Sequence, residues 1–272
     1  MEIKAVISTS GDDKYLPFLP LTIYSWNKLG VKVIVTTDVE TANSTNFKIA
    51  TSATELNFET LTFTCQDFET PTYCQTSRLF GGINQSDDTV LITGDVDMCV
   101  FSKDILVDPG NDITIFGLDL IPENQINSIT QVPICYVSMK VSTWKKVMSF
   151  KETDDLTEVL SSTLEIIKPI NVCNHWFFDQ LYLAKAVRES SVPIVSIDRR
   201  TNDTCRIATR RADRDGWSPG QKFNNLIDAH LPRPLSEQEN FDKILELFRD
   251  QYPNDDLTWL ENYYANFPFK KI

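Results

Sequence analysis

Two short runs of valine and isoleucine near the start of the chain constrain the fold most. The first, "IKAVIST", spans residues 3–9, and the second, "VKVIVTTD", spans residues 31–38. Both are nearly continuous in apolar residues, as strands are when a parallel sheet is covered on both faces. Residues 15–29, which lie between them, have the length and apolar spacing of a helix. Strand, helix and strand within forty residues predict a βαβ unit, so we expect the N-terminal half to be α/β.

The same criteria extend the α/β pattern along the chain. Further strands are predicted over residues 47–50, 61–65, 88–93, 112–118 and 133–140. Helices are predicted over residues 73–82, 142–150, 174–189, 237–250 and 256–266. Residues 198–236 are charged and contain Gly and Pro, which predicts a loop-rich segment. The sequence shows no internal repeat, low-complexity tract or long linker, so we expect one domain over residues 1–272.

The charge of the chain argues against a nucleic-acid partner. Among 272 residues there are 26 basic and 38 acidic side chains, which gives a formal net charge of -12. The basic residues form no stripe that follows a phosphate backbone. A hydrophobic content of 42% is enough for a substantial core.

The first residues and the cysteines indicate a cytoplasmic protein. "MEIKAVISTSGDDKYL" has neither the basic start nor the long apolar segment of a signal peptide. No apolar stretch approaches the about 20 residues that a membrane-spanning helix needs. The six cysteines include no Cys-x-x-Cys pair, so we expect free thiols in preference to disulfides or a zinc site.

Two aspartates that follow a strand are the clearest candidates for a binding site. Residues 87–101 read "DDTVLITGDVDMCVF", in which Asp95 and Asp97 come directly after the predicted strand 88–93. In an extended segment residues i and i+2 point the same way, so both carboxylates can converge on one point. Two close carboxylates repel each other unless a cation lies between them, and a bound divalent cation attracts a diphosphate. The sequence therefore predicts a metal or phosphate site here.

The same spacing occurs a second time in a context that favours a solvated loop. Asp213 and Asp215 flank an arginine in "DRD", but this stretch lies in the charged segment 198–236 with no strand before it. Asp95 and Asp97 differ because apolar residues precede and follow them, where a solvated charge pair is out of place.

The region around the first pair resembles a known family. "SRLFGGINQSDDTVLITGDVDMCVFSKDI" is similar to the part of the GT-A-fold glycosyltransferases, in particular the glycogenin and galactosyltransferase-like group, in which an arginine-bearing helix precedes a strand that ends in a DxD motif. "CYVSMKVSTWKKV", "WFFDQLYL" and "HLPRPL" resemble later landmarks of the group in the same order. The resemblance covers about residues 3–235 and implies a Rossmann-like α/β domain with a mixed, mostly parallel central sheet flanked by helices.

The resemblance also divides the domain. It implies a nucleotide-binding half over residues 1–100 that ends in the DxD motif. An acceptor-binding and metal-completing half follows over residues 101–236, and C-terminal helices cover residues 237–272.

The resemblance implies a metal site and its ligands. Asp97 would be a direct metal ligand, Asp95 would contact the metal or the donor ribose, and His230 of "HLPRPL" would be the third protein ligand. Carboxylates with an imidazole suit Mn²⁺ better than Ca²⁺, with Mg²⁺ a possible substitute. The alternative for His230 is an ordinary surface or core histidine.

Five more residues are implied as contacts of the donor. The backbone of Thr9 would contact the uracil, and Asp38 would contact the base or the ribose. The alternative for Thr9 is a loop start and for Asp38 a helix cap. Arg78 would pair with a carboxylate or phosphate near the donor, and Arg233 or Lys222 would neutralise the diphosphate leaving group.

Asp179 and Gln180 match the Asp-Gln segment at the reacting carbon. In an inverting enzyme Asp179 would be the general base for the acceptor hydroxyl. In a retaining enzyme, as in the resembling group, the pair would lie beneath the anomeric carbon. The alternative is that Asp179 caps the helix. Trp176 is expected either to stack on an acceptor sugar or to pack in the core.

These residues predict a Mn²⁺-dependent hexosyl- or pentosyltransferase. It would move a sugar such as glucose, galactose or xylose from a UDP-sugar to a hydroxyl of a glycan or glycoconjugate. "PICYVSMK" and "LPRPL" depart from the family's sugar-binding strand and post-histidine motif, so the sugar, the acceptor and the stereochemistry stay open, as does the oligomeric state. The alternatives are a non-catalytic protein that binds nucleotide sugars or glycans and a sugar-nucleotide nucleotidyltransferase. The latter needs a Gly-rich basic loop, where this chain has "STSGDDKYL".

Overall fold

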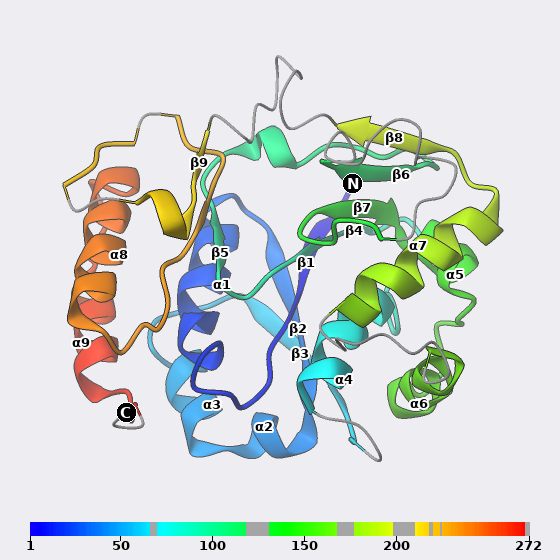
Figure 1. Ribbon diagram of the computed structural model, residues 1–272, viewed down its shortest axis with the longest axis horizontal. Coiled ribbons are helices and arrows are strands. Elements are labelled where there is room, and N and C mark those ends of the chain that lie inside the picture. The colour runs from blue at the N-terminus through cyan, green and yellow to red at the C-terminus, as the bar shows by residue number, and fades with distance from the viewer. Residues whose placement is uncertain are drawn as a thin grey trace.

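A seven-stranded sheet forms the centre of the computed structural model (Figure 1). The structure describes residues 1–65, 70–117, 131–167, 177–197, 210–217, 220–223 and 225–269. The strand order is β3-β2-β1-β4-β7-β6-β8. The strands are β1 (Ile3–Ser8), β2 (Lys32–Asp38), β3 (Phe58–Phe63), β4 (Val90–Gly94), β6 (Ile113–Phe116), β7 (Val137–Lys140) and β8 (Ile194–Ile197). β7 runs antiparallel to both of its neighbours, and the other pairs are parallel. The expected mixed, mostly parallel sheet is thus confirmed.

Helices cover both faces of this sheet. They are α1 (Leu19–Lys28), α2 (Val39–Asn43), α3 (Thr45–Thr51), α4 (Thr70–Ser77), α5 (Val141–Met148), α6 (Leu156–Ile167), α7 (Phe178–Ser190), α8 (Gln238–Gln251) and α9 (Thr258–Asn266). Strand β1 shows why two layers form, because its successive side chains point to opposite faces. Ile7 packs in one hydrophobic core with Trp26 of α1 and Phe248 of α8. Val6 packs in the other core with Trp144 of α5.

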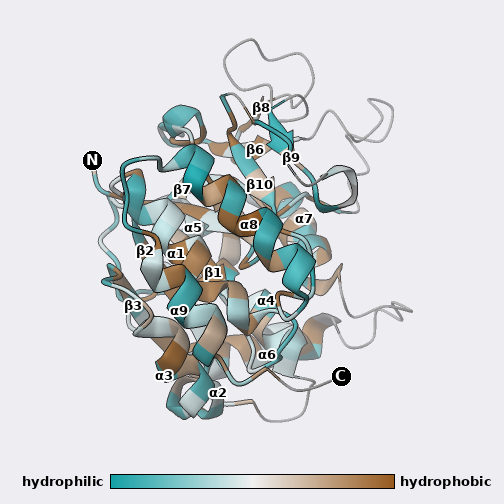
Figure 2. Cartoon of the chain, turned by 90° about the vertical axis from the view of Figure 1, so that its left-hand side faces the viewer, coloured by the Kyte–Doolittle hydropathy of each residue, from teal (hydrophilic) through white to brown (hydrophobic). Residues whose placement is uncertain are grey.

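Helix α8 is amphipathic. Helix α8 carries hydrophilic and hydrophobic residues on different sides (Figure 2). Its apolar side chains, among them Phe241, Ile244 and Phe248, are buried. No helix in the described part of the chain is long and apolar enough to cross a membrane.

A small second sheet brings a late segment of the chain to the end of β4. It contains β5 (Met98–Val100), β10 (Asp228–His230) and β9 (Arg211–Ala212), in the order β5-β10-β9. β10 runs antiparallel to β5, with His230 opposite Met98. Since β5 begins directly after Asp97, this pairing places His230 beside the predicted aspartates.

The structure corrects one predicted element and adds others. Residues 47–50, predicted as a strand, lie in helix α3, which begins after Ser44. The Ser44 hydroxyl accepts a hydrogen bond from the amide of Phe47 at 3.1 Å, as a helix cap does. The other predicted strands match β1 to β4, β6 and β7, with shifts of a few residues at their ends. Helices α2 and α6 and strands β5, β8, β9 and β10 were not predicted.

The four described cysteines are free thiols, as expected: Cys65, Cys74, Cys99 and Cys135. Cys173 and Cys205 lie outside the described residues. The divisions of the chain at residues 100 and 236 stay predictions.

Candidate active site

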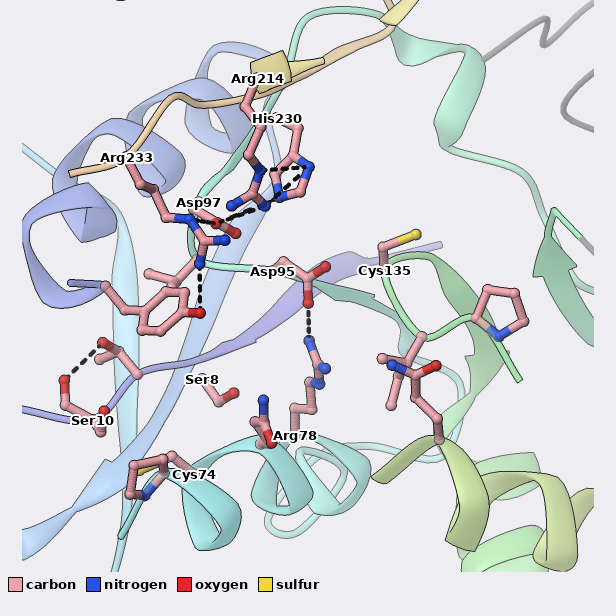
Figure 3. Close-up of a pocket in the computed structure, with 18 residues that line it drawn as sticks. Ser8, Ser10, Cys74, Arg78, Asp95, Asp97, Cys135, Arg214, His230 and Arg233 are labelled. Carbon is pink, nitrogen blue, oxygen red and sulfur yellow. Dashed lines mark hydrogen bonds and ion pairs between the residues drawn. The ribbon is translucent and has the colours of Figure 1, made fainter. Parts of the chain in front are cut away.

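A pocket of about 350 Å³ opens at the carboxyl ends of β1 and β4. The chain order along the sheet reverses between these two neighbours, and open α/β sheets bind ligands at such a point. Figure 3 shows side chains from β1, β4, α4 and the β10 region that point into this space. Seven predicted site residues line it: Thr9, Arg78, Asp95, Asp97, Gln180, His230 and Arg233.

Arg78 lies at the bottom of the pocket between two carboxylates. It follows helix α4, and its side chain is 6% exposed. One Nη donates to a carboxylate oxygen of Asp95 and to the carbonyl oxygen of Gly94, the latter at 3.1 Å. The other Nη donates to Asp179 at 2.5 Å. One guanidinium therefore joins the end of β4 to the first turn of α7.

Burial and ion pairing act in opposite directions on the two carboxylates. Burial acts to raise the pKa of Asp95, but the Arg78 guanidinium outweighs it and holds that pKa below its usual value. At Asp179, which is 1% exposed, burial outweighs Arg78 and the pKa is raised. Both carboxylates raise the pKa of Arg78 against the effect of its burial, so its positive charge is permanent.

Asp97 is surrounded by basic side chains at the other wall of the pocket. Its Oδ2 lies 3.2 Å from an Nη of Arg214, 3.5 Å from Nε of Arg233 and 3.5 Å from Nε2 of His230. Arg214 also approaches His230 Nδ1, at 3.0 Å from Nη2 and 3.3 Å from Nε. An Nη of Arg233 donates to the Tyr15 hydroxyl. Figure 3 shows Arg214, His230 and Arg233 converging on Asp97.

Arg214 also contacts one nitrogen of the His230 ring. An arginine side chain donates hydrogen bonds and accepts none, so Nδ1 is the acceptor in this contact. The other ring nitrogen, Nε2, faces Asp97.

The predicted metal ligands do not form a metal site in this arrangement. Their oxygen and nitrogen atoms are of the kinds that Mn²⁺ prefers. However, Asp95 pairs with Arg78, and both Asp97 and His230 face Arg214. Within the described part of the chain no three His, Cys, Asp or Glu side chains are placed to hold a metal ion. Mn²⁺ dependence thus stays a prediction from the sequence, and this arrangement does not fit the ion.

Asp179 and Gln180 are neighbours with different surroundings. The Asp179 carboxylate accepts from Arg78 and, at 2.8 Å, from the amide of Gln180, and it does not line the pocket. Gln180 does line it, and its Oε1 accepts from Gln131 at 2.7 Å. Asp179 therefore positions Arg78 here and has no oxygen directed at the cavity for an acceptor hydroxyl.

Two predicted donor contacts do not line the pocket. Asp38 caps helix α2, because its Oδ1 accepts from the amide of Thr41 at 2.8 Å, as the alternative for this residue stated. The Lys222 side chain is 79% exposed and pairs with Asp250 of α8 at 3.3 Å. Neither residue lines the pocket. Trp176 lies outside the described residues.

Thr9 lines the pocket, but its backbone amide and carbonyl already have hydrogen-bond partners. Its amide donates to the carbonyl of Thr36 at 3.2 Å, and its carbonyl accepts from the hydroxyl of Thr37 at 2.7 Å. The neighbouring Ser8 and Ser10 also line the pocket. The predicted backbone contact of Thr9 to a base stays a prediction.

Arg214 is the residue that sequence reasoning missed. It stands in the "DRD" stretch, which the sequence favours as a solvated loop. The flanking Asp213 is indeed 56% exposed, although its Oδ1 lies 3.6 Å from His230 Nδ1. Arg214 enters the pocket because β9, which ends two residues earlier, pairs with β10. The one signal for this was the proximity in sequence to the predicted ligand His230.

The arrangement of the strands and helices is shared with known structures. A search against family models and curated proteins finds no match for this sequence. An active-site mutant of LgtC has a TM-score of 0.54 at 12% identity, over 95% of this chain and 99% of that chain. The galactosyltransferase LgtC in complex with donor and acceptor sugar analogues has a TM-score of 0.53 at 11% identity, over 97% of this chain and 100% of that chain.

The chain has the GT-A fold. At these identities the likeness concerns the fold alone. The likeness extends over 95% and 97% of this chain.

Proposed function

We propose that this protein is a glycosyltransferase that moves a sugar from a nucleotide diphosphate sugar, with UDP as the nucleotide, to a hydroxyl of a glycan or glycoconjugate. The observation that carries the proposal is the pocket at the ends of β1 and β4, which joins two aspartates to three arginines. The GT-A fold, shared with a galactosyltransferase that binds donor and acceptor sugar analogues, supports the same activity.

The pocket combines the groups that a sugar nucleotide needs. Carboxylates such as Asp95 accept hydrogen bonds from ribose and sugar hydroxyls. The guanidinium groups of Arg214 and Arg233 match the paired oxygens of phosphates. The volume of about 350 Å³ is that of a small-molecule site.

The chemistry requires that negative charge be stabilised on the leaving group. The bond between the anomeric carbon and the diphosphate oxygen breaks, the acceptor oxygen forms a new bond to that carbon, and the acceptor hydroxyl proton passes to the departing diphosphate. Charge grows on the diphosphate as this happens, and preorganised cationic donors lower the energy of that state. Arg214 and Arg233 are held by Asp97 before the substrate arrives, so little reorganisation is required.

The test is the release of UDP from a panel of UDP-glucose, UDP-galactose and UDP-xylose. One of these donors should release UDP, and release should rise when a suitable glycan is added. Asp97→Asn should lower the rate by about 10²-fold, because it disturbs the side chains that Asp97 orients. Asp88→Asn is the matched control, since Asp88 is exposed and precedes the opposite end of β4.

Two outcomes would contradict the proposal. UDP binding without release from any UDP-sugar, with or without acceptors, would indicate a non-catalytic nucleotide-binding protein. An equal loss of activity in Asp88→Asn and Asp97→Asn would show that the pocket is not the active site.

A further inference from the structure

Arg214 has one donor group that nothing in the described part of the chain satisfies. Its Nε and Nη2 contact Asp97 and His230, but its Nη1 is buried and has no hydrogen-bond partner among the described residues. A buried guanidinium N–H without an acceptor costs free energy. Because Arg214 lines the pocket, an anionic oxygen of a ligand there would complete its hydrogen bonds.

The charges on this wall leave an excess of positive charge. Asp97 is one carboxylate between the guanidiniums of Arg214 and Arg233. Arg78, the third arginine, pairs with two carboxylates, Asp95 and Asp179, so over the whole pocket three arginines face three aspartates. Asp213 faces His230 from the same turn as Arg214, but it is largely exposed, so water screens its charge. The excess of positive charge is therefore local: beside Asp97 two guanidiniums face one carboxylate, and both attract an anion placed there.

Arg214 and a divalent cation exclude each other at this place. A metal ion bound to Asp97 would need Oδ2, which now accepts a hydrogen bond from Arg214 Nη2, and Arg214 also occupies Nδ1 of the His230 ring. It would also lie beside the positive charges of Arg214 and Arg233, which repel it. Arg214 would have to withdraw from the pocket before the ion could bind.

We propose that Arg214, with Arg233, binds the diphosphate of the donor in place of a divalent cation. This inference rests on the proposed function and narrows it: the donor is held and activated by guanidinium groups, and no metal is required. Arg214 Nη1 donates to a phosphate oxygen, while its other two nitrogens stay on Asp97 and His230. Arg214 therefore binds the leaving group and takes the place of a metal ion at the DxD motif.

The first arm of the test is calorimetric titration of UDP and of UMP in EDTA and in MnCl₂. The wild-type protein should bind UDP equally well in both buffers and should prefer UDP to UMP. Arg214→Met should weaken metal-free UDP binding by about 10- to 100-fold, the cost of a charge-assisted hydrogen bond, and should abolish the preference over UMP. Arg210→Met is the control, because Arg210 lies four residues away and pairs with Asp104 outside the pocket.

The second arm measures Mn²⁺ itself by electron paramagnetic resonance, which needs no activity. The wild-type protein should leave Mn²⁺ free, whereas Arg214→Met should bind it at the vacated Asp97 and His230. Thermal melting of each variant checks that the fold is retained.

The possible failures are distinguishable. UDP binding by the wild-type protein that depends on Mn²⁺ would overturn this inference and leave the proposed function standing. Unchanged metal-free UDP binding in Arg214→Met would also overturn it. Absence of UDP binding in either buffer would overturn the inference and the proposed function together.

Discussion

At the scale of single residues, Arg78 pairs with one fully buried carboxylate, Asp179, and with one half-buried carboxylate, Asp95. Asp95 and Asp179 both pair with it, and no other basic side chain among the described residues reaches Asp179. A buried charge pair contributes little net stability, but removal of one partner leaves an uncompensated charge, which is expensive.

We therefore expect Arg78→Met to lower the free energy of unfolding by about 3–5 kcal/mol. Urea denaturation at neutral pH measures this. Arg78→Met combined with Asp179→Leu should recover part of the loss, because one of the two stranded carboxylates is then gone. A loss below about 1 kcal/mol in the single variant, the range of an exposed ion pair, would contradict the account.

Substitutions at Asp179 and Gln180 should affect different properties: stability at Asp179 and turnover at Gln180. Asp179→Asn weakens a buried hydrogen bond to a charged group, so we expect a loss of about 2 kcal/mol in unfolding free energy. Gln180→Ala removes a pocket-lining amide and should lower the rate of UDP release by about 10²-fold with little change in stability. Urea denaturation measures the stability of each variant, and the rate of UDP release at saturating donor measures its turnover. A large loss of rate in Asp179→Asn with unchanged stability would instead support Asp179 as the reacting group.

The sequence predicted the two aspartates of the site from their place after a strand, and the resemblance to a known family implied Arg78, Gln180, His230 and Arg233. Asp95 and Asp97 follow β4, and strand ends in an α/β sheet meet at one edge, so their positions could be inferred from local pattern alone. Arg214 could not be found in this way. Its place depends on the pairing of β9 with β10, two strands of two and three residues that carry no periodic signal.

At the scale of elements, strand β10 is what holds His230 and Arg214 at the pocket. Asp228, at the start of β10, is fully buried, accepts from the Tyr136 hydroxyl at 2.8 Å and pairs with Arg211 of β9. The short sheet is thus fixed by one ionic and hydrogen-bonded cluster beneath the site.

Removal of the Asp228 carboxylate should loosen this sheet. Asp228→Ala leaves Arg211 without its partner and should cost about 3–5 kcal/mol of unfolding free energy. Tyr136→Phe removes a single hydrogen bond and should cost about 1 kcal/mol. Urea denaturation of both variants gives the comparison; equal losses would show that the ion pair does not dominate the cluster.

The elements themselves were predicted to different degrees for a physical reason. β1 and β2 are continuous runs of Val and Ile, which a strand buried on both faces requires, and they were found. The segment 47–50 was mistaken for a strand because a short apolar run has no clear period. Its cap at Ser44 and the burial of Phe47 and Ala50, three residues apart, identify the helix.

At the scale of the whole molecule, the C-terminal helices are tied to the first helix of the sheet. Asp255, between α8 and α9, pairs with Lys28 of α1 at 2.6 Å and accepts from the Tyr24 hydroxyl. The hydrogen bond from Lys28 is the main reason that the pKa of Asp255 lies below its usual value, and Tyr24 adds to it.

This tie predicts an acid-sensitive contribution to stability. Because the pKa of Asp255 is lower in the folded than in the unfolded chain, its stabilisation is complete above the unfolded value of about 4 and is lost as the pH falls through the folded value. Asp255→Asn should therefore cost up to about 1 kcal/mol at neutral pH and nothing in strong acid. Urea denaturation from neutral to acid pH tests this. A cost that grows as the pH falls would contradict it.

We expect the pocket at the ends of β1 and β4 to hold a nucleotide diphosphate against arginines. A crystal structure of the protein grown with UDP in EDTA would show this. The diphosphate should lie between Arg214 and Arg233, with an oxygen at Arg214 Nη1 and the uridine along Ser8 to Ser10. Nucleotide bound elsewhere, or an empty pocket at saturating UDP, would contradict it.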